Sequence, residues 1–375
     1  MTDQIIAAAN HLIYPRATKE EADGCAWVFY TPQIFDKYYY KLPAIGDSEV
    51  RIRNLYAGLC MSDSKTGRGC WGSQTFPLCP GHEVAGEVIA IGKDVQKVKV
   101  GDQVLLGPIR RSCQNCEFCH EGSTNLCQAL EGCEKFLYGR YFGGYASHLQ
   151  HHESHTFLLP QNIDIKSVAP LMCAGVTVFS PMNRHLKSGM RIGVLGVGGL
   201  GHLAVQFGVK MGMTVDAFCS GIQKDKQDYI RSLGTSEIHM WKDTDALAKL
   251  AGKFDALIYT IPVALDVELM DAFLKVLKPR GKLILVGAPS IEQKLKMSFF
   301  SLILNEIAVI GSCVGGSKDT EEMLQFCADN QVTSLCDQFE WEEFPQALEK
   351  MEHGSPKFRC VVNVDNFSRN FPMKH

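Results

Sequence analysis

The stretch RIGVLGVGGLGHLAVQFGVKMG, residues 191–212, decides the fold of this chain. It begins as a short apolar strand, passes through a glycine-rich turn and continues as an amphipathic helix. Glycines spaced G-x-G-x-x-G between a strand and a helix let the backbone approach a pyrophosphate at the helix N-terminus. The turn therefore predicts a dinucleotide site. Its expected contacts are Gly196, Gly198, Gly199, Leu200 and Gly201.

The segments that follow this stretch alternate between strand and helix patterns. We expect strands at 214–220, 254–261 and 282–288, and helices near 224–233 and 265–277. Strands that alternate with helices indicate a parallel doubly wound sheet with helices on both faces. The second half of the chain therefore belongs to the α/β class.

The first half has a different pattern. Residues 50–58, 82–92 and 97–107 show β-branched alternation interrupted by glycine, with a turn at Gly101 and Asp102. The character changes after about Pro170, and the C-terminal part returns to mixed α/β. A chain of 375 residues is long enough for two domains, which agrees with this change.

Composition excludes several functions. Apolar residues make up 46% and charged residues 21%, which is typical of a soluble globular protein. The net charge of −3 provides no general attraction for nucleic acid or anionic lipid, and the apolar stretches are too short for a membrane span. We interpret residues 1–21 as a polar extension, not as a signal peptide, and expect a cytoplasmic protein.

Four of the 15 cysteines form a regular ladder, C-x2-C-x2-C-x7-C, on one short polar segment. Four thiolates at this spacing can surround a tetrahedral ion and leave no open position, which predicts a structural zinc site. The alternatives are unrelated free thiols, a disulfide, which an intracellular setting disfavours, and an iron–sulfur cluster. The four residues are Cys113, Cys116, Cys119 and Cys127.

A second set of metal ligands is scattered along the chain. GLCMSD holds Cys60, PGHEVAGE holds His82 and Glu83, and APLMCAG holds Cys173. Each cysteine alone is more often a buried apolar side chain than a ligand. Together, two thiolates and an imidazole with an open fourth position are a set that holds catalytic zinc. Glu83 is either an exchangeable fourth ligand or a carboxylate behind the ligands.

Two polar residues close to Cys60 are candidates for the chemistry. A carboxylate at Asp63 could fix the tautomer of a metal-bound histidine, although a turn-capping role is the simpler reading. Ser62 could carry the proton of an alcohol, although it could equally be an ordinary surface serine.

The end of the second parallel strand predicts which dinucleotide is used. An enzyme selective for NAD places a carboxylate there against the ribose hydroxyls. This chain has Gly221 after Ser220, with Lys224 and Lys226 close by, while Asp216 lies too early in the strand. The missing carboxylate favours NADP(H), although both lysines could be solvated helix residues.

With these motifs in order, the chain resembles the zinc-containing medium-chain dehydrogenase/reductases, and it is most similar to their cinnamyl alcohol dehydrogenase branch. The resemblance covers nearly the whole chain from about residue 25. It rests on Cys60 before Ser62 and Asp63, the four-cysteine lobe, and the motifs PGHEVAGEV, VKVGDQV, APLMCAG, GVGGLGH, LVGAP and GSCVGG.

The resemblance implies a GroES-like β-barrel catalytic domain at residues 1–175, to which residues 313–375 return, and a Rossmann cofactor domain at residues 176–312. It implies two zinc ions per chain, a cleft between the domains, and a homodimer formed through the cofactor domains. Its catalytic zinc ligands fall on Cys60, His82 and Cys173, with Glu83 adjacent. Further cofactor contacts are expected at Val286, Gly287 and Ser312.

Two positions depart from the pattern of the family. Many relatives have a histidine at the position of Lys65, where it ends the proton relay, and often a histidine at the position of Met61. We expect Lys65 at the exit of the relay. Apolar candidates for the substrate pocket are Trp71, Leu130, Phe142 and Phe299.

The expected function is a zinc-dependent oxidoreductase that transfers a hydride between NADP(H) and a primary alcohol/aldehyde pair, mainly in the direction of aldehyde reduction. A polyol or secondary-alcohol dehydrogenase on the same scaffold is the alternative within enzymes. A non-catalytic binding protein is the alternative from another class. Such proteins tend to lose metal ligands, whereas this chain keeps the full set.

Overall fold

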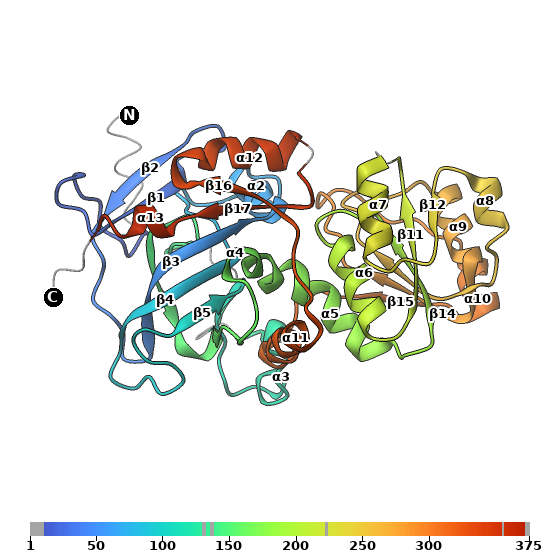
Figure 1. Cartoon of the computed structure of the whole chain (residues 1–375), viewed down its shortest axis with the longest axis horizontal. Helices are drawn as coiled ribbons and strands as arrows, with labels where there is room; N and C mark the ends of the chain where they lie inside the picture. Colours follow the sequence, from blue (N-terminus) through green and yellow to red (C-terminus); the bar gives the residue numbers. More distant parts are fainter. Residues whose placement is uncertain (1–10, 130–132, 136–138, 222–223, 355, 372–375) are drawn as a thin grey trace. The chain divides into compact units, whose positions relative to one another are not determined.

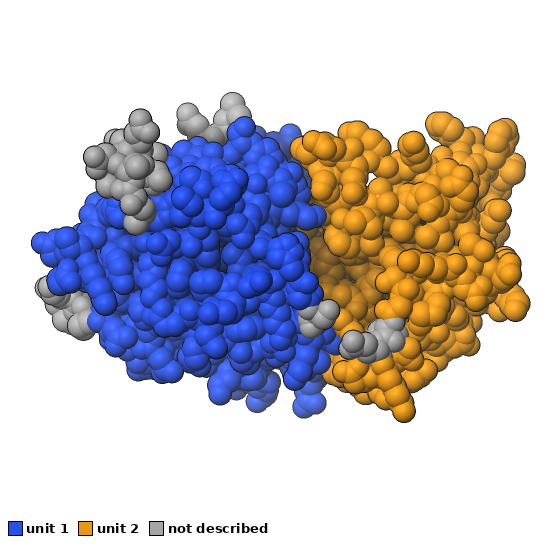
Figure 2. Space-filling view, turned by 90° about the horizontal axis from the view of Figure 1, so that it is seen from above, with its two compact units in different colours: residues 1–173, 316–375 blue, residues 174–315 orange. Residues whose placement is uncertain are grey.

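A computed structural model of the chain describes residues 11–129, 133–135, 139–221, 224–354 and 356–371. The chain forms two compact units, which Figure 2 shows in different colours. Unit 1 comprises Met1–Cys173 and Gly316–His375, and unit 2 comprises Ala174–Gly315. The C-terminal segment therefore rejoins the fold of the N-terminal part.

Unit 2 is built on a parallel six-stranded sheet in the order β12-β11-β10-β13-β14-β15. Counted from β10, this is the order 3-2-1-4-5-6 of a doubly wound dinucleotide fold, with the reversal between β10 and β13. The strands are β10 (Arg191–Leu195), β11 (Thr214–Cys219), β12 (Ile238–Met240), β13 (Phe254–Tyr259), β14 (Leu277–Leu285) and β15 (Ala308–Gly311).

Helices cover both faces of this sheet (Figure 1). Gly208 of α6 lies against Ile192 and Val215, whereas the opposite face packs Phe218 and Phe254 against residues of α8 and α9. Neighbouring strand residues point to opposite faces, so both faces of these apolar strands are buried. The helices are α5 (Ala174–His185), α6 (Gly201–Lys210), α7 (Lys224–Ser232), α8 (Thr244–Ala248), α9 (Val267–Val276) and α10 (Phe299–Asn305).

Unit 1 is built on a seven-stranded sheet in the order β16-β17-β3-β4-β5-β9, with β8 also paired to β3. Most neighbours are antiparallel, and alternate valine, isoleucine and leucine side chains of β3, β4, β5 and β8 form its core. The strands are β3 (Glu49–Leu59), β4 (Val84–Ile91), β5 (Gln103–Leu106), β8 (His148–His152), β9 (Thr156–Leu158), β16 (Cys336–Glu340) and β17 (Arg359–Asn363).

The remaining elements of unit 1 surround this sheet. A hairpin and a short two-stranded sheet flank it, and α11 lies beside α3 (Figure 1), where Lys318 N donates to Gly122 O at 3.3 Å. The strands are β1 (Gly24–Phe29), β2 (Phe35–Tyr40), β6 (Ile109–Arg111) and β7 (Glu134–Lys135). The helices are α2 (Met61–Gly67), α3 (Glu117–His120), α4 (Ile165–Val168), α11 (Ser317–Asn330), α12 (Phe344–His353) and α13 (Asp365–Ser368). Short 3-10 turns are η2 (Thr124–Leu126), η3 (Glu153–His155), η4 (Ala169–Met172) and η5 (Trp341–Glu343).

Two local expectations need correction. The strand predicted at 97–107 is confined to Gln103–Leu106, because residues up to Asp102 form the turn, in which Gly101 has a φ of +92°. The N-terminal stretch is not wholly a polar extension. Leu12 and Tyr14 are buried, and Tyr14 stacks on Phe142 with ring centroids 4.2 Å apart. This segment is therefore part of the aromatic core.

In the part of the chain that the structure describes, no single helix has the length and apolarity to cross a membrane. One bent pair passes the same test by length and composition, namely Ile165–Met172 with Ala174–His185, joined at 58°. Residues 168–172 and 174–182 are almost entirely buried inside the protein, which is the behaviour of core helices.

Candidate metal centres and cofactor site

Three segments of unit 1 bring the scattered ligands together. Cys60 follows the end of β3, His82 and Glu83 directly precede β4, and Cys173 follows η4. Strands β3 and β4 pair antiparallel, and Gly58 N donates to Glu83 O at 2.8 Å, so the first two segments lie side by side. One ligand atom from each of the four residues lies within 4.8 Å of the others.

This donor set fits zinc. Two sulfurs and one imidazole nitrogen are ligands that hold zinc while leaving a position for a substrate oxygen. A hydrogen bond from the Cys173 thiol lowers the pKa of Cys60 well below its usual value, against the opposing effect of burial. The same hydrogen bond raises the pKa of Cys173 well above its usual value, so Cys60 is the first of the two thiols to lose its proton, and metal binding displaces the proton of the second.

Asp63 orients His82 from the first turn of α2. Its Oδ1 lies 2.8 Å from His82 Nδ1 and also accepts from Gly81 N at 2.8 Å. Its Oδ2 accepts from Cys60 N at 3.2 Å, which caps the helix, and from the Tyr145 hydroxyl at 3.2 Å. The capping role and the orienting role therefore coexist. With Nδ1 directed at a carboxylate, Nε2 is left for a metal.

The two other candidates on α2 lie close to the ligands. Ser62 Oγ is 3.6 Å from Cys60 Sγ, and the side chain is partly exposed. Lys65 lies one turn further on, with Nζ 5.5 Å from the ring centroid of Trp71. Burial lowers the pKa of Lys65, although the Cys70 and Cys60 thiols oppose this.

Glu83 is fully buried, and its partner is a residue that sequence reasoning missed. Glu83 Oε1 forms an ion pair with Arg359 of β17. Its other oxygen is buried without a hydrogen-bond partner among the described residues. Burial raises the pKa of Glu83 to about 7, although the guanidinium of Arg359 lowers it. Only glycine fits at position 58, because a Cβ there would lie 2.2 Å from Glu83 Oε2.

Arg359 gave no local sequence signal, because it is one arginine 276 residues away from its partner. A charge count could not identify it. Glu83 is buried beside two thiols, and burying an unpaired carboxylate costs free energy. A buried cation next to Glu83 is therefore expected once the burial is known.

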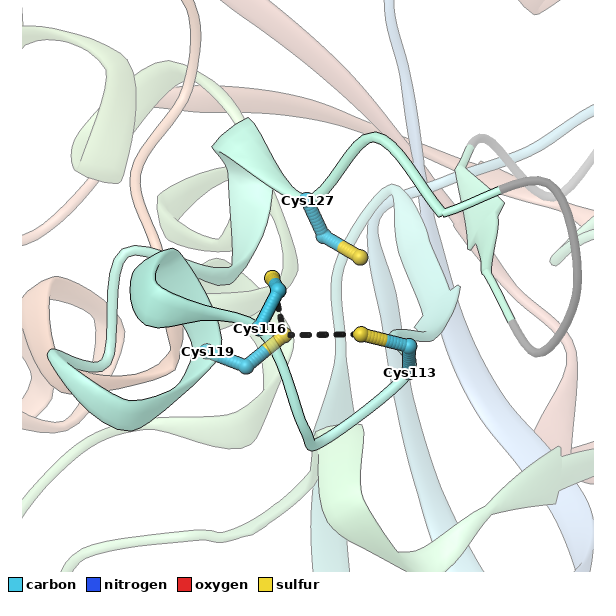
Figure 3. A group of neighbouring side chains, drawn as sticks. All are labelled: Cys113, Cys116, Cys119 and Cys127. Carbon is cyan, nitrogen blue, oxygen red and sulfur yellow. Dashed lines mark hydrogen bonds between the residues drawn. The ribbon is translucent and has the colours of Figure 1, made fainter.

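The four cysteines of the ladder gather at one point (Figure 3). Cys113 follows β6, Cys116 and Cys119 bracket the start of α3, and Cys127 follows η2. Sulfur separations are 3.8 Å for Cys113 to Cys119 and 3.5 Å for Cys116 to Cys119. Sulfurs around one tetrahedral zinc with bonds of about 2.3 Å lie about 3.8 Å apart. The group therefore fits a single ion.

No disulfide competes with this interpretation, because none of the 15 cysteines is in a disulfide bond. Burial raises the pKa of Cys127, but backbone hydrogen bonds from Cys113 and Ala129 lower it to about 6. A multi-iron cluster would need the sulfurs farther apart than a single ion does. A single zinc is thus the better fit to this lobe.

The glycine turn in unit 2 has the expected geometry. Gly196 has a φ of +87°, and a Cβ on Gly201 would lie 2.0 Å from Gly196 O. A Cβ on Gly198, in contrast, would meet nothing within 4 Å. The structure adds Thr260, whose Oγ1 donates to Leu195 O at 2.9 Å and lies 2.5 Å from Gly196 O. Thr260 therefore ties the turn to the end of β13.

The other expected cofactor residues lie at the carboxyl ends of the parallel strands, where ligands of such sheets bind. Ser220 and Gly221 follow β11, Val286 and Gly287 follow β14, and Ser312 follows β15. Ser312 N donates to Leu285 O at 3.0 Å, and Gly287 N donates to Tyr259 O at 2.9 Å. Lys224 and Lys226 lie in the first turn of α7, with Lys224 exposed and Lys226 partly buried.

Asp216 is excluded from the ribose position by its partners. It is buried inside β11, where Oδ2 accepts from Arg191 at 2.7 Å and lies 2.9 Å from His239 Nε2. These contacts join three neighbouring strands. Glu237 completes a third group of possible metal ligands with Asp216 and His239, but the arginine already neutralises the buried carboxylate.

The four residues predicted to line the substrate pocket lie in different surroundings. Phe142 is wrong as a pocket wall, because it is fully buried in the aromatic core. Phe299 is 79% exposed at the start of α10, in a group of exposed apolar residues. Trp71 lies beside Lys65 on the segment that follows α2. Leu130 falls outside the described residues.

Comparison with known families matches both halves of the chain. Residues 46–161 match the alcohol dehydrogenase GroES-like domain, and residues 199–329 match the zinc-binding dehydrogenase domain. A cinnamyl alcohol dehydrogenase of Arabidopsis thaliana is 33% identical over 344 residues, which cover 90% of this chain and 95% of the relative. A mannitol dehydrogenase of Petroselinum crispum is 34% identical over 89% of this chain and 98% of its own length.

Solved structures agree. A cinnamyl alcohol dehydrogenase from Sorghum bicolor superposes with a TM-score of 0.83 at 29% identity, covering 91% of this chain and 97% of that chain. One from Helicobacter pylori, complexed with NADP(H), superposes with a TM-score of 0.81 at 30% identity, covering 91% and 98%.

The chain therefore belongs to the zinc-containing alcohol dehydrogenases of the medium-chain dehydrogenase/reductase family. Within that family it falls in the cinnamyl alcohol dehydrogenase-like branch. The membership confirms the expected α/β fold, with a GroES-like domain and a Rossmann-like domain, and it confirms that the protein is an alcohol dehydrogenase.

Proposed function

We propose that this chain reduces an aldehyde to a primary alcohol with NADPH, and catalyses the reverse reaction when NADP⁺ and alcohol are in excess. The observation that carries the proposal is the convergence of Cys60, His82 and Cys173 on one point of unit 1. Names of relatives support the substrate class, since several are cinnamyl alcohol dehydrogenases. When bound, zinc supplies a Lewis acid and the nicotinamide supplies a hydride.

The residues around the ligands have distinct proposed roles. Asp63 holds the tautomer of His82, so that Nε2 faces the ion. Glu83 and Arg359 form a buried ion pair behind the ligands, with one Glu83 oxygen left for an exchangeable contact. Ser62 Oγ, partly exposed beside Cys60, relays the alcohol proton: it accepts that proton while its own hydroxyl proton passes onward, and the transfer runs in reverse during reduction. Lys65 lies one helical turn beyond, where its ammonium can supply a proton during aldehyde reduction and its neutral amine can accept one during alcohol oxidation.

The same reasoning assigns the second ion and the cofactor. Cys113, Cys116, Cys119 and Cys127 hold a structural zinc with no open position. NADP(H) is supported by the relative from Helicobacter pylori that is complexed with it, and by the absence of a carboxylate after Ser220. Lys224 and Lys226 are placed at the start of α7, where a 2′-phosphate needs positive charge.

A substrate screen tests this proposal. The purified chain is mixed with NADPH or NADH and with panels of aldehydes, ketones and ketoses, and the loss of reduced cofactor is followed. We expect the highest kcat/KM with NADPH and either an aromatic or an unbranched aliphatic aldehyde. A higher kcat/KM with NADH would contradict the cofactor assignment. No turnover of any carbonyl compound by protein that holds both zinc ions would contradict the function.

A polyol dehydrogenase is the second candidate, because three of the relatives are named mannitol dehydrogenases, at 34–35% identity. The same screen separates the two functions. Reduction of ketoses with a higher kcat/KM than that for aldehydes would favour this alternative.

We further propose a homodimer in a reducing compartment such as the cytoplasm. The edge strand β15 and the neighbouring helix α10 support the dimer, because α10 exposes four large apolar side chains. Contiguous apolar surface of this kind usually marks an interface. A reducing compartment is supported by the two sets of cysteine metal ligands and by the absence of a disulfide among the 15 cysteines. The four side chains are Phe299, Phe300, Ile303 and Leu304.

A further inference from the structure

The Asp63 carboxylate is held by more than the metal ligand that it orients. Four hydrogen bonds reach it, two on each oxygen. Oδ1 faces His82 and the backbone of Gly81, whereas Oδ2 faces the backbone of Cys60 and the Tyr145 hydroxyl. Three of these donors belong to the metal ligands or to the residue next to one. The fourth donor, the Tyr145 hydroxyl, comes from a segment 82 residues further along the chain.

Tyr145 is held by several contacts besides its bond to Asp63. Its backbone N donates to Pro80 O at 3.0 Å, and Trp27 N donates to Tyr145 O at 2.8 Å. Its ring packs against Phe344 of α12, with centroids 4.7 Å apart, and the side chain is fully buried. The hydroxyl therefore reaches Asp63 from a rigid aromatic core.

The turn that carries His82 has room for this ring only because residue 81 is glycine. Gly81 has a φ of +106°, and a Cβ there would lie 2.5 Å from Gly144 N and 2.7 Å from a ring carbon of Tyr145. Burial raises the pKa of Tyr145 well above its ordinary value, and the Asp63 carboxylate raises it further. The hydroxyl thus keeps its proton and acts as a donor.

We propose that Tyr145 is a positioning residue of the catalytic metal centre: its hydroxyl fixes Oδ2 of Asp63, and thereby keeps Oδ1 directed at His82. Without this bond, Oδ2 loses one of two 3.2 Å hydrogen bonds and keeps the one from Cys60 N, so the carboxylate is held less firmly in the orientation that faces the imidazole. Partners behind metal ligands typically change metal affinity by about 10- to 100-fold when they are lost. Since Tyr145 acts through Asp63, we expect an effect near the lower end of that range.

The inference rests on the proposed zinc chemistry at Cys60, His82 and Cys173, so the test begins with the wild-type protein. Zinc release to a chromogenic chelator is followed over time and should show two phases per chain. The site with an open position exchanges faster than the closed four-cysteine site. A wild-type protein with a single phase and one ion would contradict the proposed function itself, before any variant is compared.

Tyr145→Phe keeps the ring and removes only the hydroxyl. We expect the fast phase to accelerate about tenfold while the slow phase keeps its rate. Tyr38→Phe is the matched control, because it removes another buried hydroxyl from the same aromatic core, one that donates to Tyr14 O at 3.2 Å. It should change neither phase.

Two results would overturn the inference. One is an unchanged fast phase in Tyr145→Phe. The other is equal acceleration of both phases, since that is the sign of a generally loosened fold. A second comparison checks the route: in an Asp63→Asn background, adding Tyr145→Phe should accelerate the fast phase far less than it does in the wild type. Full additivity would show that Tyr145 does not act through Asp63.

Discussion

At the scale of single residues, the candidate catalytic centre depends on a few polar atoms buried in unit 1. Asp63 pairs with His82 and Arg359 pairs with Glu83, so both of the non-sulfur ligand candidates have a charged partner. Such pairing is needed because an isolated buried charge is costly. Ser62 differs from these residues, since it is partly exposed and its Oγ contacts only Cys60 among the described hydrogen bonds.

Ser62→Ala should lower kcat for aldehyde reduction by about 100-fold, the lower end of the range for a positioned proton-transfer group. Zinc content should stay at the wild-type value, because no ligand is altered. Stopped-flow or steady-state kinetics with metal analysis of the same sample checks both points. Ser64→Ala, which alters a neighbouring helix residue whose hydroxyl contacts Glu352, is the control. Wild-type turnover in Ser62→Ala would remove this serine from the proton path.

At the scale of elements, the glycine turn between β10 and α6 separates two roles. Gly201 touches the turn itself, so Gly201→Ala should force the start of α6 away from Gly196 and lower the melting temperature. Gly198 faces open space, so Gly198→Ala should melt like the wild type but bind NADPH at least about tenfold more weakly. Thermal melts and NADPH titration measure the two effects. Wild-type NADPH affinity in Gly198→Ala would place the pyrophosphate elsewhere.

Strand β8 makes the fold sensitive to acid. Burial lowers the pKa of His148 from 6.5 to about 3, with Arg53 and Arg51 adding to the effect. The unfolded chain therefore takes up a proton below about pH 6.5 that the folded chain refuses. Above about pH 6.5 the His148 imidazole is mostly neutral in both the folded and the unfolded chain, so the free energy of unfolding keeps its full value. As the pH drops from there toward 3, the free energy of unfolding falls by up to about 1.4 kcal/mol per pH unit.

Denaturant unfolding of zinc-loaded protein between pH 7 and pH 5 tests this contribution. Between pH 7 and pH 5, the free energy of unfolding should fall by about 2 kcal/mol less in His148→Gln than in the wild type. The zinc sites also respond to acid, but they are shared by both proteins and cancel in the comparison. An equal fall in the two proteins would mean that His148 is protonated in the folded state.

At the scale of the whole molecule, α10 and β15 predict how chains assemble. Phe299, Phe300 and Leu304 are between 73% and 79% exposed, which a monomer rarely tolerates in one patch. Phe300→Glu combined with Leu304→Glu should leave the chain monomeric where the wild type forms the proposed dimer, as light scattering coupled to size exclusion would show. Val100→Glu, which alters a single exposed valine of unit 1, is the control. A wild-type protein that is monomeric at micromolar concentration would contradict the assembly.

The fold and the ligand sets could be predicted from the sequence because their signals are local or regularly spaced. The strand, glycine turn and helix at 191–212 lie in one continuous stretch, and four cysteines share one short segment. The partners Arg359, Thr260 and Tyr145 could not be found in this way. Each reaches the site through sheet pairing or packing between distant segments, and none belongs to a motif. Phe142 failed as a pocket residue for the same reason.

The central claim is that Cys60, His82 and Cys173 hold one exchangeable zinc, separate from the zinc of the four-cysteine lobe. The most direct measurement is zinc content together with NADPH-dependent aldehyde reduction in Cys173→Ala. We predict a fall from about two ions per chain to about one, with loss of turnover. Cys79→Ala, which removes a buried thiol outside both ligand groups, should keep both ions and turnover. Two tightly held ions in Cys173→Ala, or undiminished reduction of aldehydes, would contradict the account.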